Sequence, residues 1–210
     1  TLKPHPRLYL DPTTGPRARA VTQHPALRRA HREVRQLAEH FVQTPVFEWE
    51  LNTHNAHLLR ARQMQCRVAT LLVRWRQTKA RRYRDAALEH LLEMGRWEYW
   101  SWIAWRKGDP APDAVFDLSY GENCATLAIG WDWLHDDLSA AERQALLSVA
   151  RRPVAAFMRF SAGREQAWWF GKADSNWNTV CAGGAGMLAL SMQEVLDEAP
   201  VMLQRSQASV

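Results

Sequence analysis

Three apolar segments recur at an almost constant spacing along the chain, and they constrain the fold more than any other feature. They begin at Cys66, Cys124 and Cys181, which lie 58 and 57 residues apart. Internal periodicity is the signature of repeated supersecondary units, and helices that are apolar on all sides are buried inside a larger assembly. We therefore predict three buried inner helices, the second opening near Ser119 and the third near Asn178.

A helix of a different kind follows each of the first two inner segments. Residues 80–94 and 140–158 carry apolar side chains along one stripe and charged side chains elsewhere. This pattern is typical of amphipathic surface helices. Ser139 and Glu142 predict a capping box at the start of the second one, whereas Pro153 predicts a kink or a break inside it.

Two more helices complete the predicted pattern. One precedes the first repeat over about 26–43, and a third outer helix is expected to begin near Val195. Two layers of helices predict an all-α fold, with residues 1–210 forming a single (α/α) toroid or barrel domain. A solenoid is the competing architecture. Because three helix pairs do not close a six-pair ring, we expect the toroid to be incomplete.

The composition is that of a globular protein with one sizeable core. The chain has 210 residues, of which 47% are hydrophobic and 23% are charged, and both fractions are ordinary for a soluble domain. No apolar run approaches the roughly 18 residues of a membrane span. The formal net charge of +5 weakly favours anionic partners through long-range steering. We predict no membrane segment and no nucleic-acid partner, and the sequence leaves the oligomeric state open.

The cysteines, histidines and glycines point to no metal and no cofactor. An odd number of cysteines without short spacing argues against disulfides and a zinc site, so all three are interpreted as buried, reduced core residues. His54 and His57 form the only close histidine pair, and no third ligand accompanies them. No glycine-rich phosphate loop follows a strand. Gly183, Gly184 and Gly186 lie inside an apolar segment, where we expect them to allow close helix packing.

The connections between the predicted helices differ in length. The turns from inner to outer helices are short, at about 76–79 and 135–139, whereas the return connections over roughly 44–55, 96–119 and 161–177 are long. In an up-and-down arrangement all the long connections emerge at one end, which is where binding sites usually form. These connections hold eight of the eleven tryptophans.

We interpret the aromatic side chains of the long connections as the lining of a sugar-binding cleft. Flat aromatic faces offer apolar area to a pyranose ring, while polar neighbours bond its hydroxyl groups. The alternative interpretation is that these side chains form small local cores beneath the loops. The candidate substrate-binding residues are His54, Trp97, Trp100, Tyr120, Glu122, Trp168, Trp169 and Trp177.

Two segments that open inner helices, 119–123 and 174–178, carry the strongest site signal. Helix N-termini present unpaired N–H groups and a positive dipole end, which stabilise a carboxylate group of a ligand. One of the polar residues in the second segment is expected to be only an N-cap. Capping of the helix needs only one polar side chain, whereas two asparagines, Asn176 and Asn178, stand on either side of Trp177. Both are therefore candidate ligand-binding residues.

At these residues the chain resembles the heparinase II/III-like polysaccharide lyases. The resemblance rests on residues 5–10 (His-Pro-Arg-Leu-Tyr-Leu), on 120–133 with Leu138 and Ser139 after it, and on 176–186. It implies an N-terminal helical toroid followed by β-sandwich domains, which are absent from this chain. It also implies a periplasmic or secreted location.

The resemblance further implies a chemistry, the β-elimination of uronate-containing polysaccharides such as alginate, heparan sulfate or chondroitin sulfate. In the family an asparagine, often followed by histidine, neutralises the uronate carboxylate, which acidifies the C5 proton. A tyrosine or histidine removes that proton, and a tyrosine commonly protonates the leaving oxygen. Carried over, Asn176 or Asn178 would be the catalytic neutraliser, although Trp177 and Thr179 stand where the family has histidine. The family's catalytic tyrosine would fall beyond Val210, so we expect this chain alone to be inactive.

Two other functions stay open at the level of the sequence. An (α/α) glycoside hydrolase needs two carboxylates across the scissile bond, and the candidate pairs are Glu122 with Asp174, or Asp117 with Glu165. A non-catalytic glycan-binding protein of the same fold is the other, because the histidine is missing and no tyrosine follows Tyr120. The particular polymer and the choice between endo and exo action are not encoded in any of these patterns.

Overall fold

The computed structural model describes residues 2–10, 14, 24–45, 47–51, 53, 55–101, 108–109, 111 and 113–210. Within these ranges the chain is helical and contains no β-strand, which confirms the predicted all-α class. The elements are α2 (Pro25–Gln43), α3 (Ala56–Thr78), α4 (Arg81–Arg96), α5 (Leu118–Leu134), α6 (Ala140–Phe160), α7 (Asn176–Ser191) and α8 (Ala199–Ser209), with 3-10 turns η2 (His135–Asp137) and η3 (Gly163–Glu165).

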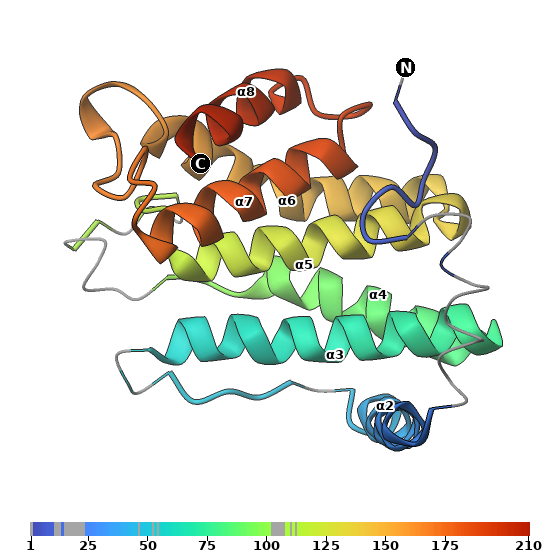
Figure 1. Ribbon diagram of the computed structural model, residues 1–210. Helices are drawn as coiled ribbons and strands as arrows, with labels where there is room; N and C mark the ends of the chain where they lie inside the picture. The colour runs from blue at the N-terminus through green and yellow to red at the C-terminus, as the bar shows by residue number, and fades with distance from the viewer. Residues whose placement is uncertain are drawn as a thin grey trace.

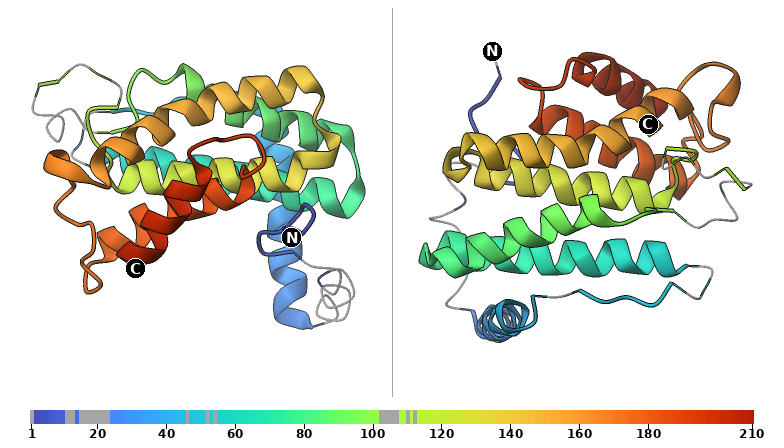
Figure 2. Two further views of the ribbon diagram at one scale, coloured as in Figure 1. Left: turned by 90° about the horizontal axis from the view of Figure 1, so that it is seen from above. Right: turned by 180° about the vertical axis from the view of Figure 1, so that it is seen from behind.

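The helices lie in two layers. Helices α3, α5 and α7 lie side by side and run in the same direction, while α4 and α6 lie behind them and run back (Figures 1 and 2). Helix α8 packs on α7, and α2 packs against α3 and α4. The predicted alternation of inner and outer helices is therefore present, with α3, α5 and α7 as the inner members.

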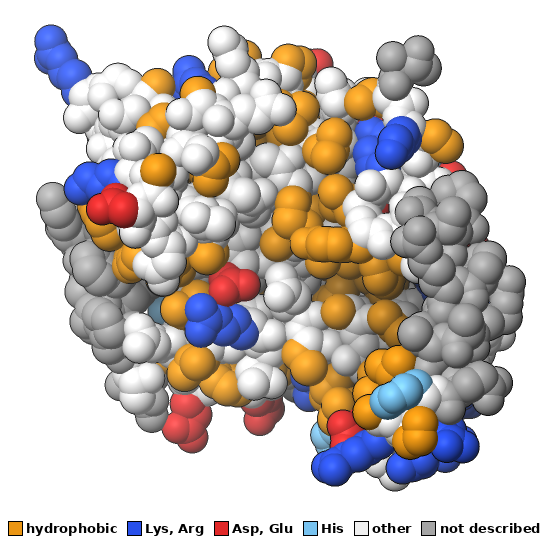
Figure 3. Space-filling model, in the orientation of Figure 1, with side chains coloured by type: hydrophobic (Ala, Val, Ile, Leu, Met, Phe, Trp, Pro, Cys, Tyr) orange, Lys and Arg blue, Asp and Glu red, His pale blue; other side chains and the backbone are white. Residues whose placement is uncertain are grey.

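The inner layer has one face that the outer helices do not cover. Apolar side chains gather there over α5 and α7 (Figure 3). Ile129, Trp133, Met187 and Leu190 are half-buried and pack against the core from these two helices. This explains why the inner segments are apolar nearly all round, since both their faces carry apolar side chains.

Helix α6 begins as the sequence predicts. Ser139 Oγ accepts a hydrogen bond from the Glu142 backbone N–H at 3.3 Å, and the Glu142 carboxylate accepts one from the Ser139 N–H at 2.8 Å. These two bonds satisfy donors that a helix start otherwise leaves unpaired. The expected capping box is thus confirmed.

Of the kink or break predicted at Pro153, the break does not occur, because α6 runs without interruption from Ala140 to Phe160. A proline inside a helix removes one backbone hydrogen bond. Pro153 is itself buried, and so are its neighbours Val154 and Phe157. Since most helical stability in proteins comes from tertiary packing of the apolar face, this burial holds α6 together across the missing bond.

Helix α8 begins four residues later than the start expected near Val195. Its first residue is Ala199, and Pro200 lies in its first turn. A proline is well tolerated there, because the N–H that it lacks would have no partner inside the helix. Pro200 therefore marks the start of α8.

The cysteines do not all belong to the core. Cys124 and Cys181 are buried on α5 and α7, and burial raises the pKa of both thiols. Cys66 is exposed, so its interpretation as a core residue is wrong. It lies on a face of α3 that no neighbouring helix covers, between the exposed Arg62 and the half-buried Arg67.

The N-terminal segment is held by a buried carboxylate at the end of α5. Asp132 accepts hydrogen bonds from the backbone N–H groups of Arg7, at 2.9 Å to each oxygen, and of Leu8 at 2.8 Å. The His5 Nδ1 lies 2.6 Å from the same carboxylate. In addition, the Trp133 indole N–H donates a hydrogen bond to the Leu8 carbonyl at 3.0 Å. These contacts dock residues 5–8 on the end of the molecule where the short turns lie (Figure 1).

The outer helices α4 and α6 are joined by a half-buried ion pair. Arg84 donates from Nη1 and Nη2 to the two oxygens of Glu142, at 2.6 Å each, and also to the Asp137 carbonyl at 2.8 Å. Two parallel bonds of this kind are the strong form of an arginine–carboxylate contact. The hydrogen bonds from Arg84 lower the pKa of Glu142 to about 2.

A buried histidine on α4 is expected to make the fold less stable in mild acid. His90 is 1% exposed, and burial lowers its pKa from 6.5 to about 4, with Arg67 as a second cause. Between these two values the unfolded chain takes up a proton that the folded chain refuses, so stability falls as the pH falls. The expected loss between pH 7 and 4.5 is about 2 to 3 kcal/mol.

Urea unfolding of the wild type and of His90→Gln at both pH values measures this contribution. Between pH 7 and 4.5 both proteins should lose stability. The loss in unfolding free energy should be about 2 to 3 kcal/mol larger for the wild type than for His90→Gln, because the glutamine cannot take up a proton. Parallel pH profiles for the two proteins would show that His90 does not stay neutral in the folded chain.

Candidate functional site

The long connections emerge at one end of the molecule, as expected. Because α3, α5 and α7 run in the same direction, their N-terminal ends lie together, on the left in Figure 1. The described parts of the connections before these helices meet there. His54 lies outside the described residues, as do Trp102 and Trp105.

Several of the expected sugar-binding residues lie in the core. The buried ones are Trp97, Trp100, Tyr120 and Trp169. The Trp100 indole N–H donates to the Met94 carbonyl at 2.8 Å, and the Trp169 indole N–H donates to the Phe116 carbonyl at 2.9 Å. Burial raises the pKa of Tyr120, so its hydroxyl stays protonated. These side chains form the local core that was the alternative interpretation, and they anchor the loops that surround them.

An exposed aromatic pair stands at the start of α7. Trp168 is 53% exposed, and its ring centroid lies 5.2 Å from that of the half-buried Trp177, at an interplanar angle of 52°. The Lys172 ammonium lies 5.1 Å from the centroid of the Trp168 ring. Asn176, the first residue of α7, is exposed beside them in the chain. We call Trp168, Lys172, Asn176 and Trp177 the Trp168 cluster.

A cavity of about 600 Å³ adjoins this cluster. Its aromatic wall includes Trp168, Trp169 and Trp177, and it also contacts Arg159 and Arg164 at the end of α6 and just beyond it. No motif in the sequence pointed to these two arginines. Their position at the end of an outer helix, directly before a long connection, is the signal that could have identified them.

The N-termini of α5 and α7 differ in their capping. Asp117 caps α5, since one of its oxygens accepts the backbone N–H groups of Ser119 at 2.9 Å and Tyr120 at 3.2 Å. Ser175 occupies the N-cap position of α7, but its side chain accepts no bond from the helix. In the first turn of α7 the Asn178 N–H donates to the Ser175 carbonyl at 3.0 Å, so a backbone contact stands where α5 has a side-chain cap.

The two candidate asparagines have different surroundings. Asn178 is fully buried, its amide N–H donates to the Ser209 carbonyl, and its amide oxygen accepts the Ser209 hydroxyl at 2.5 Å. These bonds tie α7 to the end of α8 and use both ends of the amide. Of the two asparagines, only Asn176 presents its side chain to solvent.

One of the two candidate carboxylate pairs shares the cavity. Asp117 and Glu165 both line it. Burial raises the pKa of Asp117 to about 6. Two hydrogen bonds from Arg159, at 2.8 and 2.9 Å, lower the pKa of Glu165. Environments that push two pKa values apart in this way suit an acid and a base.

The other carboxylate pair is not brought together at this cavity. Glu122 has 17% of its side chain exposed and pairs with Arg62 at 3.0 Å on the inner face. Asp174 is exposed in the loop before α7. Neither residue lines the cavity beside the Trp168 cluster.

Among the described residues, no group of three or more histidine, cysteine, aspartate or glutamate side chains could hold a metal ion. None of the described helices combines the length and the apolar composition needed to cross a membrane. No protein-family model matches the chain, and no curated protein matches it.

Proposed function

We propose that this chain is the helical part of a polysaccharide lyase, an incomplete (α/α) toroid that binds uronate-containing polysaccharide at the Trp168 cluster. The observation that carries the proposal is the exposed Trp168 ring, with the half-buried Trp177 and Lys172 beside it, at the start of a helix that has no side-chain cap. The proposed location, periplasmic or secreted, follows from this class of substrate.

Each part of the cluster matches one part of a uronate residue. The exposed ring of Trp168, with the half-buried ring of Trp177 beside it, offers an apolar surface to the sugar ring. The Lys172 ammonium and the Asn176 amide are donors for its carboxylate. Asn176 takes the role of neutraliser, because charge that develops on the carboxylate during elimination is stabilised by donors already in place.

The remaining steps of elimination need a base and an acid close to C5 and to the leaving oxygen. No tyrosine or histidine is among the described residues that line the cavity. The cluster therefore supports binding and neutralisation, and we expect this chain by itself to bind the polymer without cleaving it.

Binding is tested by titrating oligosaccharides of alginate, heparan sulfate, chondroitin sulfate and hyaluronan into the chain by calorimetry. Trp168→Ala and Asn176→Ala should each weaken binding by about tenfold or more, which corresponds to about 1.4 kcal/mol. Tyr9→Ala is the matched control, since Tyr9 is a 71% exposed aromatic residue directly after Leu8, which is bonded to Asp132 and Trp133 at the C-terminal end of α5, and it should leave the affinity unchanged. Failure of all four polymers to bind contradicts the proposal.

The reaction is tested by the ultraviolet absorbance of unsaturated uronate, on this chain and on the same chain with whatever natural sequence follows Val210. A rise in absorbance that Asn176→Ala abolishes supports β-elimination. New reducing ends without a rise in absorbance favour hydrolysis instead.

Glycoside hydrolysis is the second candidate function, and the shared cavity of Asp117 and Glu165 favours it. The raised pKa of Asp117 suits a general acid, and the lowered pKa of Glu165 suits a base or a nucleophile. In this case Asp117→Asn and Glu165→Gln should abolish the release of reducing ends, while Asn176→Ala should not.

A further inference from the structure

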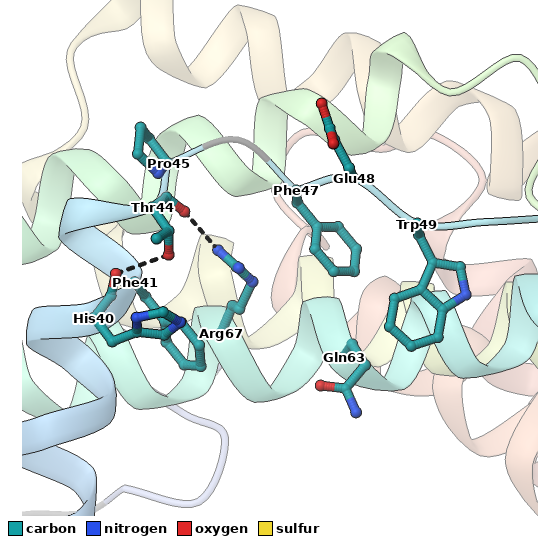
Figure 4. Close-up of a pocket in the computed structure, with 9 residues that line it drawn as sticks. All are labelled: His40, Phe41, Thr44, Pro45, Phe47, Glu48, Trp49, Gln63 and Arg67. Atoms are coloured by element: carbon teal, nitrogen blue, oxygen red, sulfur yellow. Dashed lines mark hydrogen bonds between the residues drawn. The ribbon is translucent and has the colours of Figure 1, made fainter.

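A second hollow, of about 670 Å³, lies between the end of α2, the start of the following connection and α3. Figure 4 shows Phe41 of α2 and Phe47 of the connection on either side of Arg67, which comes from α3. The Arg67 guanidinium carbon lies 4.7 Å from the Phe41 ring centroid and 5.1 Å from that of Phe47. Aromatic rings thus hold this cation on two sides, at the edge of an open hollow.

Arg67 has no anionic partner in the described part of the chain. Its Nη1 donates to the Thr44 carbonyl at 2.9 Å and lies 3.4 Å from His90 Nε2, and no carboxylate among the described residues forms an ion pair with it. Glu48 lines the hollow, but it points away from Arg67 in Figure 4. Burial lowers the pKa of Arg67, which means that its charge is partly removed from water. An anion bound beside it would offset that cost.

The rest of the hollow is suited to a ring with hydroxyl groups. The rings of Phe47 and Trp49 lie 5.9 Å apart at an interplanar angle of 36°, along the same wall as Arg67. Gln63 and His40 also line the hollow, with side chains that donate and accept hydrogen bonds. A flat apolar wall, polar edges and one arginine fork match the face, the hydroxyl groups and the anionic group of an acidic sugar.

We propose that this hollow, the Arg67 pocket, binds a hydroxylated ring that carries one anionic group, such as a uronic acid. The Arg67 guanidinium would pair with the anionic group, and Phe47 and Trp49 would contact the ring. The inference goes beyond the proposed function, because the Arg67 pocket shares no residue with the Trp168 cluster and contacts different helices.

The test is a titration followed by the indole N–H resonance of Trp49 in NMR spectra, assigned from the Trp49→Phe variant. It is performed in the Trp168→Ala background, so that binding at the Trp168 cluster does not contribute. The probes are methyl glucuronide, its neutral counterpart methyl glucoside, and benzoate. Methyl glucuronide should shift the resonance, methyl glucoside should bind at least tenfold more weakly, and benzoate should bind more weakly than the glucuronide.

Arg67→Gln should weaken glucuronide binding at least tenfold, while Arg35→Gln, an exposed arginine of α2, should leave it unchanged. Circular dichroism melts show whether Arg67→Gln is folded, and Trp49→Ala read by calorimetry supplies a second, surface variant that should also lose affinity. Equal affinity for glucuronide and glucoside, or unchanged affinity in Arg67→Gln, would overturn the proposal. Tighter binding of benzoate would overturn the sugar assignment in favour of aromatic acids. Loss of polymer binding in Trp168→Ala with a persistent Trp49 shift supports both sites separately.

Discussion

Replacing Gly184 by alanine is expected to destabilise the fold by about 3 kcal/mol or more, because overpacking at a backbone contact cannot relax through side chains. A Cβ atom at Gly184 would lie 2.1 Å from the Gly121 carbonyl oxygen and 2.8 Å from its carbonyl carbon. The contact is reciprocal, since a Cβ atom at Gly121 would lie 2.5 Å from the Val180 oxygen. Helices α5 and α7 therefore touch backbone to backbone, and one added methyl group would force them apart.

Gly183 provides a control one residue away in the same helix. A Cβ atom there would meet nothing within 4 Å. Gly183→Ala should therefore stabilise the protein by about 1 kcal/mol, the gain in helix propensity from glycine to alanine. Thermal and urea unfolding of the two variants should move in opposite directions from the wild type.

Equal shifts for the two variants would mean that α5 and α7 do not approach as closely as these distances require. A large loss in Gly183→Ala alone would place the close contact on the other face of α7. Gly121→Ala offers an independent check from the other helix and should resemble Gly184→Ala, because both methyl groups would enter the same contact.

The glycine contact joins two of the three segments on which the proposed function draws, residues 5–10, 120–133 and 176–186. Gly121 lies in the second of these segments and Gly184 in the third, and the first segment docks on the second through Asp132. The three segments therefore meet one another, although they are far apart in the sequence. Gly121 and Gly184 form the contact between α5 and α7, Asp132 holds the N-terminal segment, and Asn176 with Trp177 belong to the Trp168 cluster.

Local sequence patterns predicted the helices well, because each pattern had a local physical cause. The apolar segments, the amphipathic stripes and the capping box at Ser139 predicted helices α3 to α7 and the alternation of their up-and-down directions. The unequal connections placed the long loops at one end. The closure of a ring depends on how successive helix pairs pack, and no local pattern encodes it, so the toroid stays a proposal.

The candidate site was harder to predict, because burial is a property of the whole fold. Trp168 and Trp169 are adjacent in the sequence, yet one is exposed and the other is in the core. Asn176 and Asn178 are two residues apart, yet one faces solvent and the other binds Ser209. Neither distinction follows from residue type or spacing. Each depends on which side of α7, and of the loop before α7, packs against α5 and α8.

Asp132→Asn is expected to destabilise the protein by about 3 kcal/mol, comparable to breaking a buried, hydrogen-bonded charge pair. The carboxylate is 1% exposed and faces only donors, the N–H groups of Arg7 and Leu8 and the ring of His5. An amide in its place would turn its own NH₂ group toward one of these N–H groups. The change keeps the shape of the side chain, so the loss reports the hydrogen bonds and the charge.

Asp136→Asn is the matched control, since Asp136 is an exposed carboxylate nearby whose hydrogen-bond partner is its neighbour His135. Its cost should stay below about 0.5 kcal/mol, as for most surface substitutions. Hydrogen exchange distinguishes loss of docking from general loosening: the amides of Arg7 and Leu8 should exchange much faster in Asp132→Asn, beyond the change in the core of α5. If Asp132→Asn and Asp136→Asn unfold at the same urea concentration, the buried carboxylate does not stabilise the docking of the N-terminal segment. If Asp132→Asn alone is destabilised, the contact between residues 5–8 and the end of α5 is part of what stabilises the inner layer.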